Sequence, residues 1–218
     1  MGCFGLGIII LLILPIIIFL LLLNVITISF SALGLSQLGA ILLLAAVLIG
    51  SMINIPISRR RIVLESPQKP FSRFFFYIPP RVSTQVIAVN IGGAVIPTLF
   101  AIYLIPRSPL LPTLAATLVL ILVSRLIARP VPGVGIMLPG FIPPLVSAGL
   151  AILLARDNPA PVAFISGTLG TLIGADLLNW PNFKKLGAHM ISIGGAGVFD
   201  GIFLAGILAV LISSIPSL

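Results

Sequence analysis

The sequence predicts an all-α integral membrane protein, a polytopic bundle of about seven transmembrane helices. Hydrophobic residues make up 59% of its 218 residues and charged residues only 7%, whereas soluble chains carry about 25% charged residues. The apolar residues stand in long unbroken runs rather than in the alternating pattern of a membrane β-barrel. Because lipid cannot satisfy backbone polar groups, helices are the elements expected from such runs.

We expect seven membrane segments, since a helix needs about 20 apolar residues to cross a bilayer. The first run is too long for a signal-peptide core and has no basic start, so we expect it to be a retained helix. All seven belong to a single integral membrane domain of residues 1–218. The segments lie near 4–28, 33–56, 83–105, 110–128, 138–155, 159–179 and 196–215.

The stretch between the fourth and fifth segments is rich in proline and glycine, from Pro130 to Pro144. Proline removes a backbone donor and clashes with the preceding helical turn. We therefore expect a broken or re-entrant segment here, leading into the fifth helix.

The basic residues predict how the chain is oriented. If the polar loop 58–81 is cytoplasmic, ten of the twelve Lys and Arg residues fall inside, and only Arg107 and Arg156 fall outside. The N-terminus is then cytoplasmic and the C-terminus outside. This bias explains the net charge of +8 by topology, and we expect no nucleic-acid partner. The inside set is Arg59, Arg60, Arg61, Lys69, Arg73, Arg81, Arg125, Arg129, Lys184 and Lys185.

Two short stretches of the sequence are similar to each other, VNIGGA at 89–94 and ISIGGA at 191–196. Both would lie toward the cytoplasmic end of a segment that runs outward. Chance, a parallel repeat of the transporter kind, and close packing of small residues between helices all stay open as explanations.

Two of the four acidic residues are candidate site residues. Glu65 lies in the basic loop, and Asp157 adjoins Arg156 at the outer surface. Asp176 and Asp200 instead fall within the sixth and seventh segments. A charge at the centre of a membrane helix costs about 2.5–3.5 kcal/mol on insertion scales, so such a residue faces a cavity or a partner.

The short connection between these two segments predicts that the aspartates meet. Adjacent antiparallel helices would place Asp176 and Asp200 at similar depth, near the cytoplasmic face. Two close carboxylates share a proton, because both cannot ionise. One can then act as the general base toward water and the other as the general acid toward a carbonyl.

This arrangement resembles the presenilin and signal-peptide-peptidase type of intramembrane aspartyl protease, over about 159–215. Those families carry Tyr-Asp in one helix and Gly-x-Gly-Asp in the next. Here Ala175 stands in the tyrosine position, and two further residues precede Asp200 after the glycine-rich stretch. The resemblance implies an intramembrane aspartic endopeptidase that cleaves transmembrane peptides with Asp176 and Asp200 as its catalytic residues.

The resemblance also implies a set of supporting residues. The glycines before Asp200 would keep the approach open, so that an extended substrate strand can lie beside it. A Pro-Ala-Leu motif completes the site in those families, and only upstream prolines can replace it here. The supporting residues are Gly194, Gly195, Gly197, Gly201, Pro139 and Pro143. The overall pattern also resembles a prokaryotic family of small multi-pass membrane proteins, which predicts a prokaryotic plasma membrane.

Two other functions stay open from the sequence. The same aspartates could bind protons or a small cation in a transporter or channel, with the broken segment offering free carbonyls. Alternatively, they could pair with Arg125, Lys184 or His189 in a non-catalytic membrane assembly subunit.

We expect no cofactor and no metal, because no His/Cys/Asp cluster has ligand spacing and no glycine-rich phosphate loop follows a strand. The expected partners are the lipid bilayer and, for a protease, transmembrane peptides. The sequence is also compatible with an oligomer.

Overall fold

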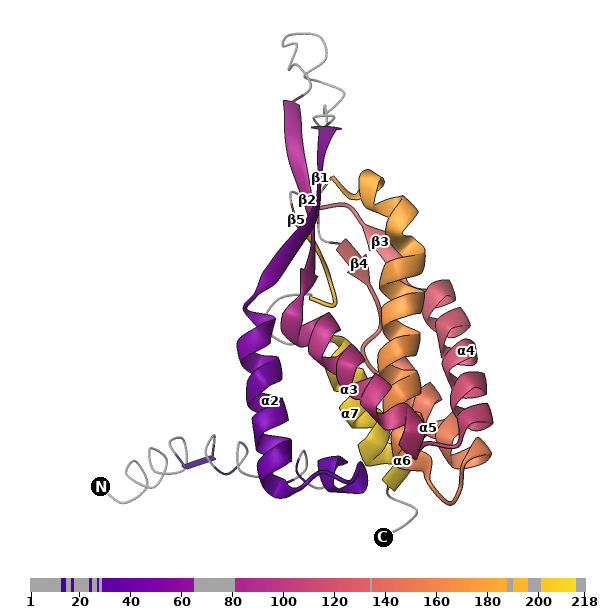
Figure 1. Cartoon of the computed structure of the whole chain (residues 1–218). Coiled ribbons are helices and arrows are strands. Elements are labelled where there is room, and N and C mark those ends of the chain that lie inside the picture. The colour runs from indigo at the N-terminus through magenta and orange to yellow at the C-terminus, as the bar shows by residue number, and fades with distance from the viewer. Residues whose placement is uncertain are drawn as a thin grey trace, which may run out of the picture.

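The computed structural model describes residues 13, 14, 17, 24, 27, 29–64, 81–133, 135–187, 190–195 and 201–214. This part of the chain is mainly helical, with a small sheet that extends from one end of the helices (Figure 1). The all-α expectation is therefore wrong in part. Most of the first expected segment, 4–28, lies outside the described residues.

The first complete helix leads directly into the sheet. Helix α2 (Gln37–Ser51) begins after Ser36, whose hydroxyl oxygen accepts a hydrogen bond from the Gly39 N–H at 3.1 Å, a common helix N-cap. Strand β1 (Asn54–Leu64) follows and pairs antiparallel with strand β2 (Arg81–Asn90). The start of the expected polar loop 58–81 is therefore part of a strand.

The third expected helix, 83–105, is wrong over its first part, because strand β2 occupies residues up to Asn90. We predicted a helix there, but only residues from 91 onward are helical, first as a π-helical turn, η2 (Ile91–Val95), and then as α3 (Ile96–Leu104). Mean hydropathy does not separate an apolar strand from an apolar helix. The β-branched residues of VSTQVIAV at 82–89 favour a strand and were the signal available in the sequence.

The outer helix and a hairpin come next in the chain. A short 3₁₀ turn, η3 (Ile105–Arg107), leads to α4 (Leu110–Ile127), which occupies the fourth expected segment. A two-stranded antiparallel hairpin, β3 (Arg129–Val131) with β4 (Gly135–Met137), stands where we expected the broken segment. Helix α5 (Ile142–Leu154) follows.

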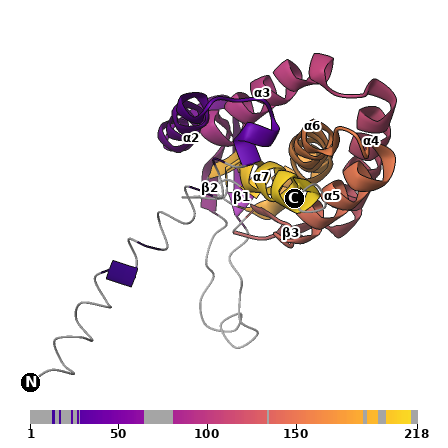
Figure 2. The same ribbon diagram turned by 90° about the horizontal axis from the view of Figure 1, so that it is seen from below.

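A long irregular helix runs through the middle of the molecule. It comprises α6 (Pro159–Ile165), two π-helical turns, η4 (Ser166–Gly170) and η5 (Leu172–Asp176), and the 3₁₀ stretch η6 (Leu177–Leu186). We call residues 159–186 the central helix. Figure 2 shows α6 within an arc of α3, α4 and α5, with α7 (Gly201–Ser214) beside it.

Strand β5 (Met190–Ile193) completes the three-stranded sheet, in the order β1-β2-β5. It pairs parallel with β2, and Val89 lies opposite Ile193. The two similar stretches of the sequence are therefore neighbours in space. The first is the end of β2 leading into α3, and the second includes the end of β5.

Small residues set the distance between the helices. A Cβ on Gly174 would lie 2.4 Å from the carbonyl oxygen of Ile121 in α4, and one on Gly92 would lie 2.0 Å from that of Val47 in α2. Both contacts are with backbone atoms, which cannot move aside cheaply. The packing of small residues that the sequence suggested for Gly92 is therefore present in the structure.

Two helices of the described chain are long and apolar enough to cross a membrane, Leu110–Ile127 and Pro159–Phe183. The other apolar helices of 10–17 residues are Gln37–Ser51, Ile91–Arg107, Ile142–Leu154 and Ile202–Ser213. The count of about seven spanning segments therefore stays a prediction.

Candidate functional site: a pocket between the sheet and the central helix

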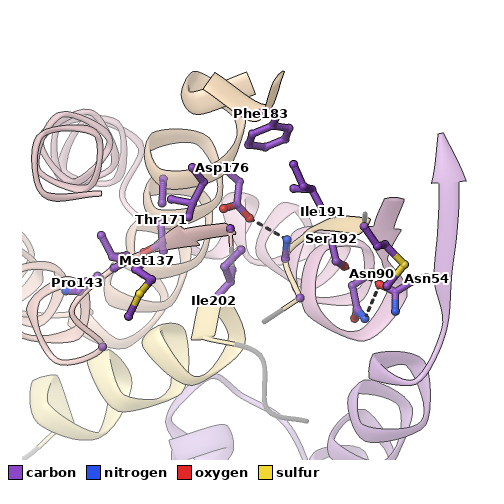
Figure 3. Close-up of a pocket in the computed structure, with 18 residues that line it drawn as sticks. Asn54, Asn90, Met137, Pro143, Thr171, Asp176, Phe183, Ile191, Ser192 and Ile202 are labelled. Carbon is purple, nitrogen blue, oxygen red and sulfur yellow. Dashed lines mark hydrogen bonds between the residues drawn. The ribbon is translucent and has the colours of Figure 1, made fainter. Parts of the chain in front are cut away.

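A pocket of about 520 Å³ lies where the sheet meets the central helix (Figure 3). Apolar side chains from four elements form much of its wall, among them Met137, Phe183, Ile191 and Ile202. Polar groups stand on two sides. The central helix contributes Thr171 and Asp176, and the sheet side contributes Asn54, Asn90 and Ser192. A concave apolar wall with a few polar groups is typical of a ligand-binding site.

Asp176 links the central helix to Gly194, the residue that directly follows β5, through a hydrogen bond. Its Oδ2 accepts a hydrogen bond from the backbone N–H of Gly194 at 2.8 Å. Gly194 has a φ of 76°, a left-handed conformation that favours glycine. A Cβ there would also lie 2.6 Å from the Cβ of Ala94. The other carboxylate oxygen, Oδ1, makes no hydrogen bond within the described residues.

The π-helical turn determines which residue lies beside Asp176 on the pocket wall. In an α-helix, residues five apart point about 140° away from each other. A turn with i→i+5 hydrogen bonds brings such residues back toward one face, and Thr171 and Asp176 both line the pocket. The hydroxyl oxygen of Thr171 is buried and has no hydrogen-bond partner among the described residues.

The second predicted aspartate, Asp200, lies outside the described residues, as does Gly197. The predicted meeting of Asp176 with Asp200 therefore stays a prediction. Ile202, which follows Asp200 by two positions in the sequence, lines the same pocket as Asp176. Gly201 is the first residue of α7.

Three of the predicted supporting residues line the pocket with Asp176, namely Gly194, Gly195 and Pro143. Pro139 is not among the lining residues, although its two sequence neighbours are. The structure therefore brings the hairpin region and the β5 region together around Asp176.

Arg125, one of the expected basic partners of the aspartates, has a different partner. Its Nη1 donates to Oδ1 of Asn179 at 3.0 Å. Asn179 in turn donates from Nδ2 to the carbonyl oxygen of Ala175 at 2.8 Å. The side chain of Lys184, and the whole of His189, lie outside the described residues.

Sequence reasoning missed the polar cluster on the sheet side, Asn54 with Asn90 and Ser192. We had placed Asn90 inside a membrane helix, whereas it ends a strand. The available signal was the similarity between the two stretches, in which Asn90 and Ser192 occupy equivalent positions. Among the residues that the structure describes, no group of three or more His, Cys, Asp or Glu side chains could hold a metal ion.

Fold and site together define a mainly helical protein with a small sheet and an apolar pocket. Among the residues that the structure describes, Asp176 supplies the carboxylate of this pocket. The chain belongs to the family described as "Protein of unknown function (DUF1614)", which it matches over residues 48–212. All the residues that line the pocket fall within this match. Searches of curated proteins and of solved structures gave no match.

Proposed function

We propose that this protein is a multi-pass membrane hydrolase that cleaves peptide bonds of transmembrane substrates in the pocket, with Asp176 and Asp200 as its acid–base pair. The observation that carries the proposal is the position of Asp176, whose half-buried side chain lines an apolar pocket together with Gly195 and Ile202, on either side of Asp200 in the sequence.

The outer surface of α4 supports the membrane setting. This helix turns a row of leucines away from the rest of the protein, and 22% of its 18-residue span is buried. Water-exposed apolar patches of this kind are rare on soluble monomers, whereas lipid favours them. The exposed leucines of α4 are Leu110, Leu111, Leu114, Leu118, Leu122 and Leu126.

The distribution of charge supports the orientation. Arg59, Arg60 and Arg61 lie on β1, and Arg129 begins β3, at the sheet end of the molecule (Figure 1). The loops at the opposite end contain Arg107 and Arg156. Under the positive-inside rule the sheet faces the cytoplasm, which would put the pocket near the cytoplasmic surface of the membrane.

The proposed reaction needs only water and two carboxyl groups. The ionised aspartate removes a proton from water as the water oxygen bonds to the peptide carbonyl carbon, and the neutral aspartic acid protonates the carbonyl oxygen. The C–N bond then breaks as the leaving amine takes the proton held by the first aspartate, and one hydroxyl of the intermediate returns its proton to the second aspartate, which leaves a carboxylic acid and an amine as products. Strand β5 lies at an edge of the sheet, so an extended substrate could lie along it.

The test uses the full-length chain in liposomes with synthetic transmembrane peptides, and the products are identified by mass spectrometry. We expect Asp176→Asn and Asp200→Asn each to abolish cleavage while the protein stays folded. Asp157→Asn is the matched control, because Asp157 is exposed in the loop at the opposite end. Cleavage retained in either of the first two variants would rule out the aspartate pair. Proton or cation flux that depends on both residues, without cleavage, would favour the transporter.

A further inference from the structure

Backbone groups fix the orientation of the amide side chains on the sheet side of the pocket. The N–H of Gly93 can only donate, and it donates to Asn90 at 2.7 Å, so the accepting atom of Asn90 is Oδ1. The Asn90 nitrogen then donates to the carbonyl oxygen of Ser51 at 2.7 Å and to Asn54 at 3.2 Å. The atom of Asn54 that faces Asn90 must therefore be its oxygen.

The same oxygen of Asn54 accepts a second hydrogen bond, from the hydroxyl of Ser192 at 2.5 Å. The amide nitrogen of Asn54 makes no hydrogen bond within the described residues. Asn54 is half-buried and lines the pocket. The two N–H groups of Asn54 are therefore the donors that this cluster leaves for a ligand. Figure 3 places Asn54, Asn90 and Ser192 together, apart from Asp176.

We propose that the amide of Asn54 binds a main-chain carbonyl oxygen of the peptide in this pocket, which makes Asn54 a substrate-binding residue. This inference rests on the proposed function for the identity of the ligand. Asn54 lines the pocket with two N–H donors that no described residue uses, and Asp176 lines it with one unused carboxylate oxygen. A peptide backbone matches both, because it carries carbonyl acceptors and N–H donors. A bare cation would make no use of the Asn54 donors, since N–H groups repel it.

The decisive variant is Asn54→Asp in the full-length protein. Aspartate keeps an oxygen that accepts from Asn90 and Ser192, but it replaces both donors with a second oxygen. The matched control is Asn158→Asp, the same substitution at an exposed asparagine that does not line the pocket. The probe is a fluorescent apolar peptide with a hydroxyethylene group in place of one amide, and its binding is measured by anisotropy in detergent.

We expect Asn54→Asp to weaken probe binding about tenfold or more, as loss of a hydrogen bond together with repulsion of the carbonyl predicts. Its melting temperature should stay close to that of the wild type. Asn158→Asp should change the affinity by less than about threefold, because Asn158 lies outside the pocket. A role limited to supporting the fold would give the opposite pattern, with stability changed and affinity retained.

A second measurement tests the same hydrogen bond by changing the ligand instead of the protein. The proposal can therefore be tested even if Asn54→Asp does not fold. Probes in which each carbonyl in turn is replaced by a methylene should show, for the wild type, about a tenfold loss at one position. Equal losses at all positions, no loss, or no binding of the parent probe would overturn the role of Asn54. Failure of the proposed hydrolysis is seen separately, in cleavage that persists in the aspartate variants.

Discussion

Two long apolar helices of this protein have very different surroundings. Helix α4 and the span Pro159–Phe183 of the central helix are both long enough to cross a membrane, with mean hydropathies of 2.2 and 1.5. In α4, 22% of the most apolar 18-residue stretch is buried, against 72% of the corresponding stretch in the central helix. Hydropathy alone ranks α4 slightly higher, but it does not reveal which helix lies in the middle of the bundle.

The difference follows from the size and polarity of the side chains. On α4, leucines point outward and are exposed, so no neighbouring residue restricts their shape. On the central helix, a Cβ added to Gly170 would lie 2.7 Å from the Cβ of Leu120 in α4, and one added to Gly167 would lie 3.3 Å from the Cα of Gly206 in α7. Buried hydroxyls and the π-helical turns are also found there. Irregular backbone at membrane depth is tolerated where neighbouring protein covers it.

The largest effect should come from a charge on the outer face of α4. Leu118→Lys places an ammonium group at the middle of this helix, where Leu118 is exposed, and insertion scales put the cost at about 2.5–3.5 kcal/mol in lipid. The yield of protein that remains in membranes after carbonate extraction should fall sharply. Leu111→Lys, close to the helix end, should cost less because lysine can reach the interface. If the variants were equally and fully tolerated, α4 would not face lipid.

A somewhat smaller effect should come from added volume on the central helix. Gly174→Ala puts a methyl group against the backbone of α4, and overpacking of this kind typically costs about 1–3 kcal/mol. Gly149→Ala in α5 is the matched control, since a Cβ there meets nothing within 4 Å. That change should raise stability by up to about 1 kcal/mol, through better helix propensity. Thermal unfolding in detergent measures both, and equal melting temperatures would contradict the packing.

The smallest effect is expected at two threonines of the central helix, whose substitution should affect probe binding differently. Thr168 and Thr171 are both buried, and their oxygens lack hydrogen-bond partners among the described residues. Only Thr171 lines the pocket, whereas Thr168 lies against Gly206. Because no hydrogen bond is lost, Thr→Val at either position should leave stability unchanged or slightly higher. Only Thr171→Val should alter binding of the peptide probe, by a few-fold. Equal effects of the two substitutions on probe binding would contradict a contact between Thr171 and the bound peptide.

The candidate site was predictable from the sequence in part. Asp176 stood out because a carboxylate within an apolar run needs a cavity or a partner, and the structure places it on a pocket wall. Pro143, Gly194 and Gly195 were named as supporting residues through the resemblance, and they line the same pocket. Asn54 was not foreseen, because it was assigned to the end of a helix and its role depends on contacts with residues 36 and 138 positions away.

The sequence by itself determined the apolar character of this protein, the helix at 110–127 and the exceptional position of Asp176. These follow from composition and from the local cost of placing a charge among apolar residues. Tertiary structure alone decided that β5 pairs with β2, and that the central helix is enclosed while α4 is exposed. Strand pairing and burial depend on partners distant in the chain, and hydropathy carries no information about those partners.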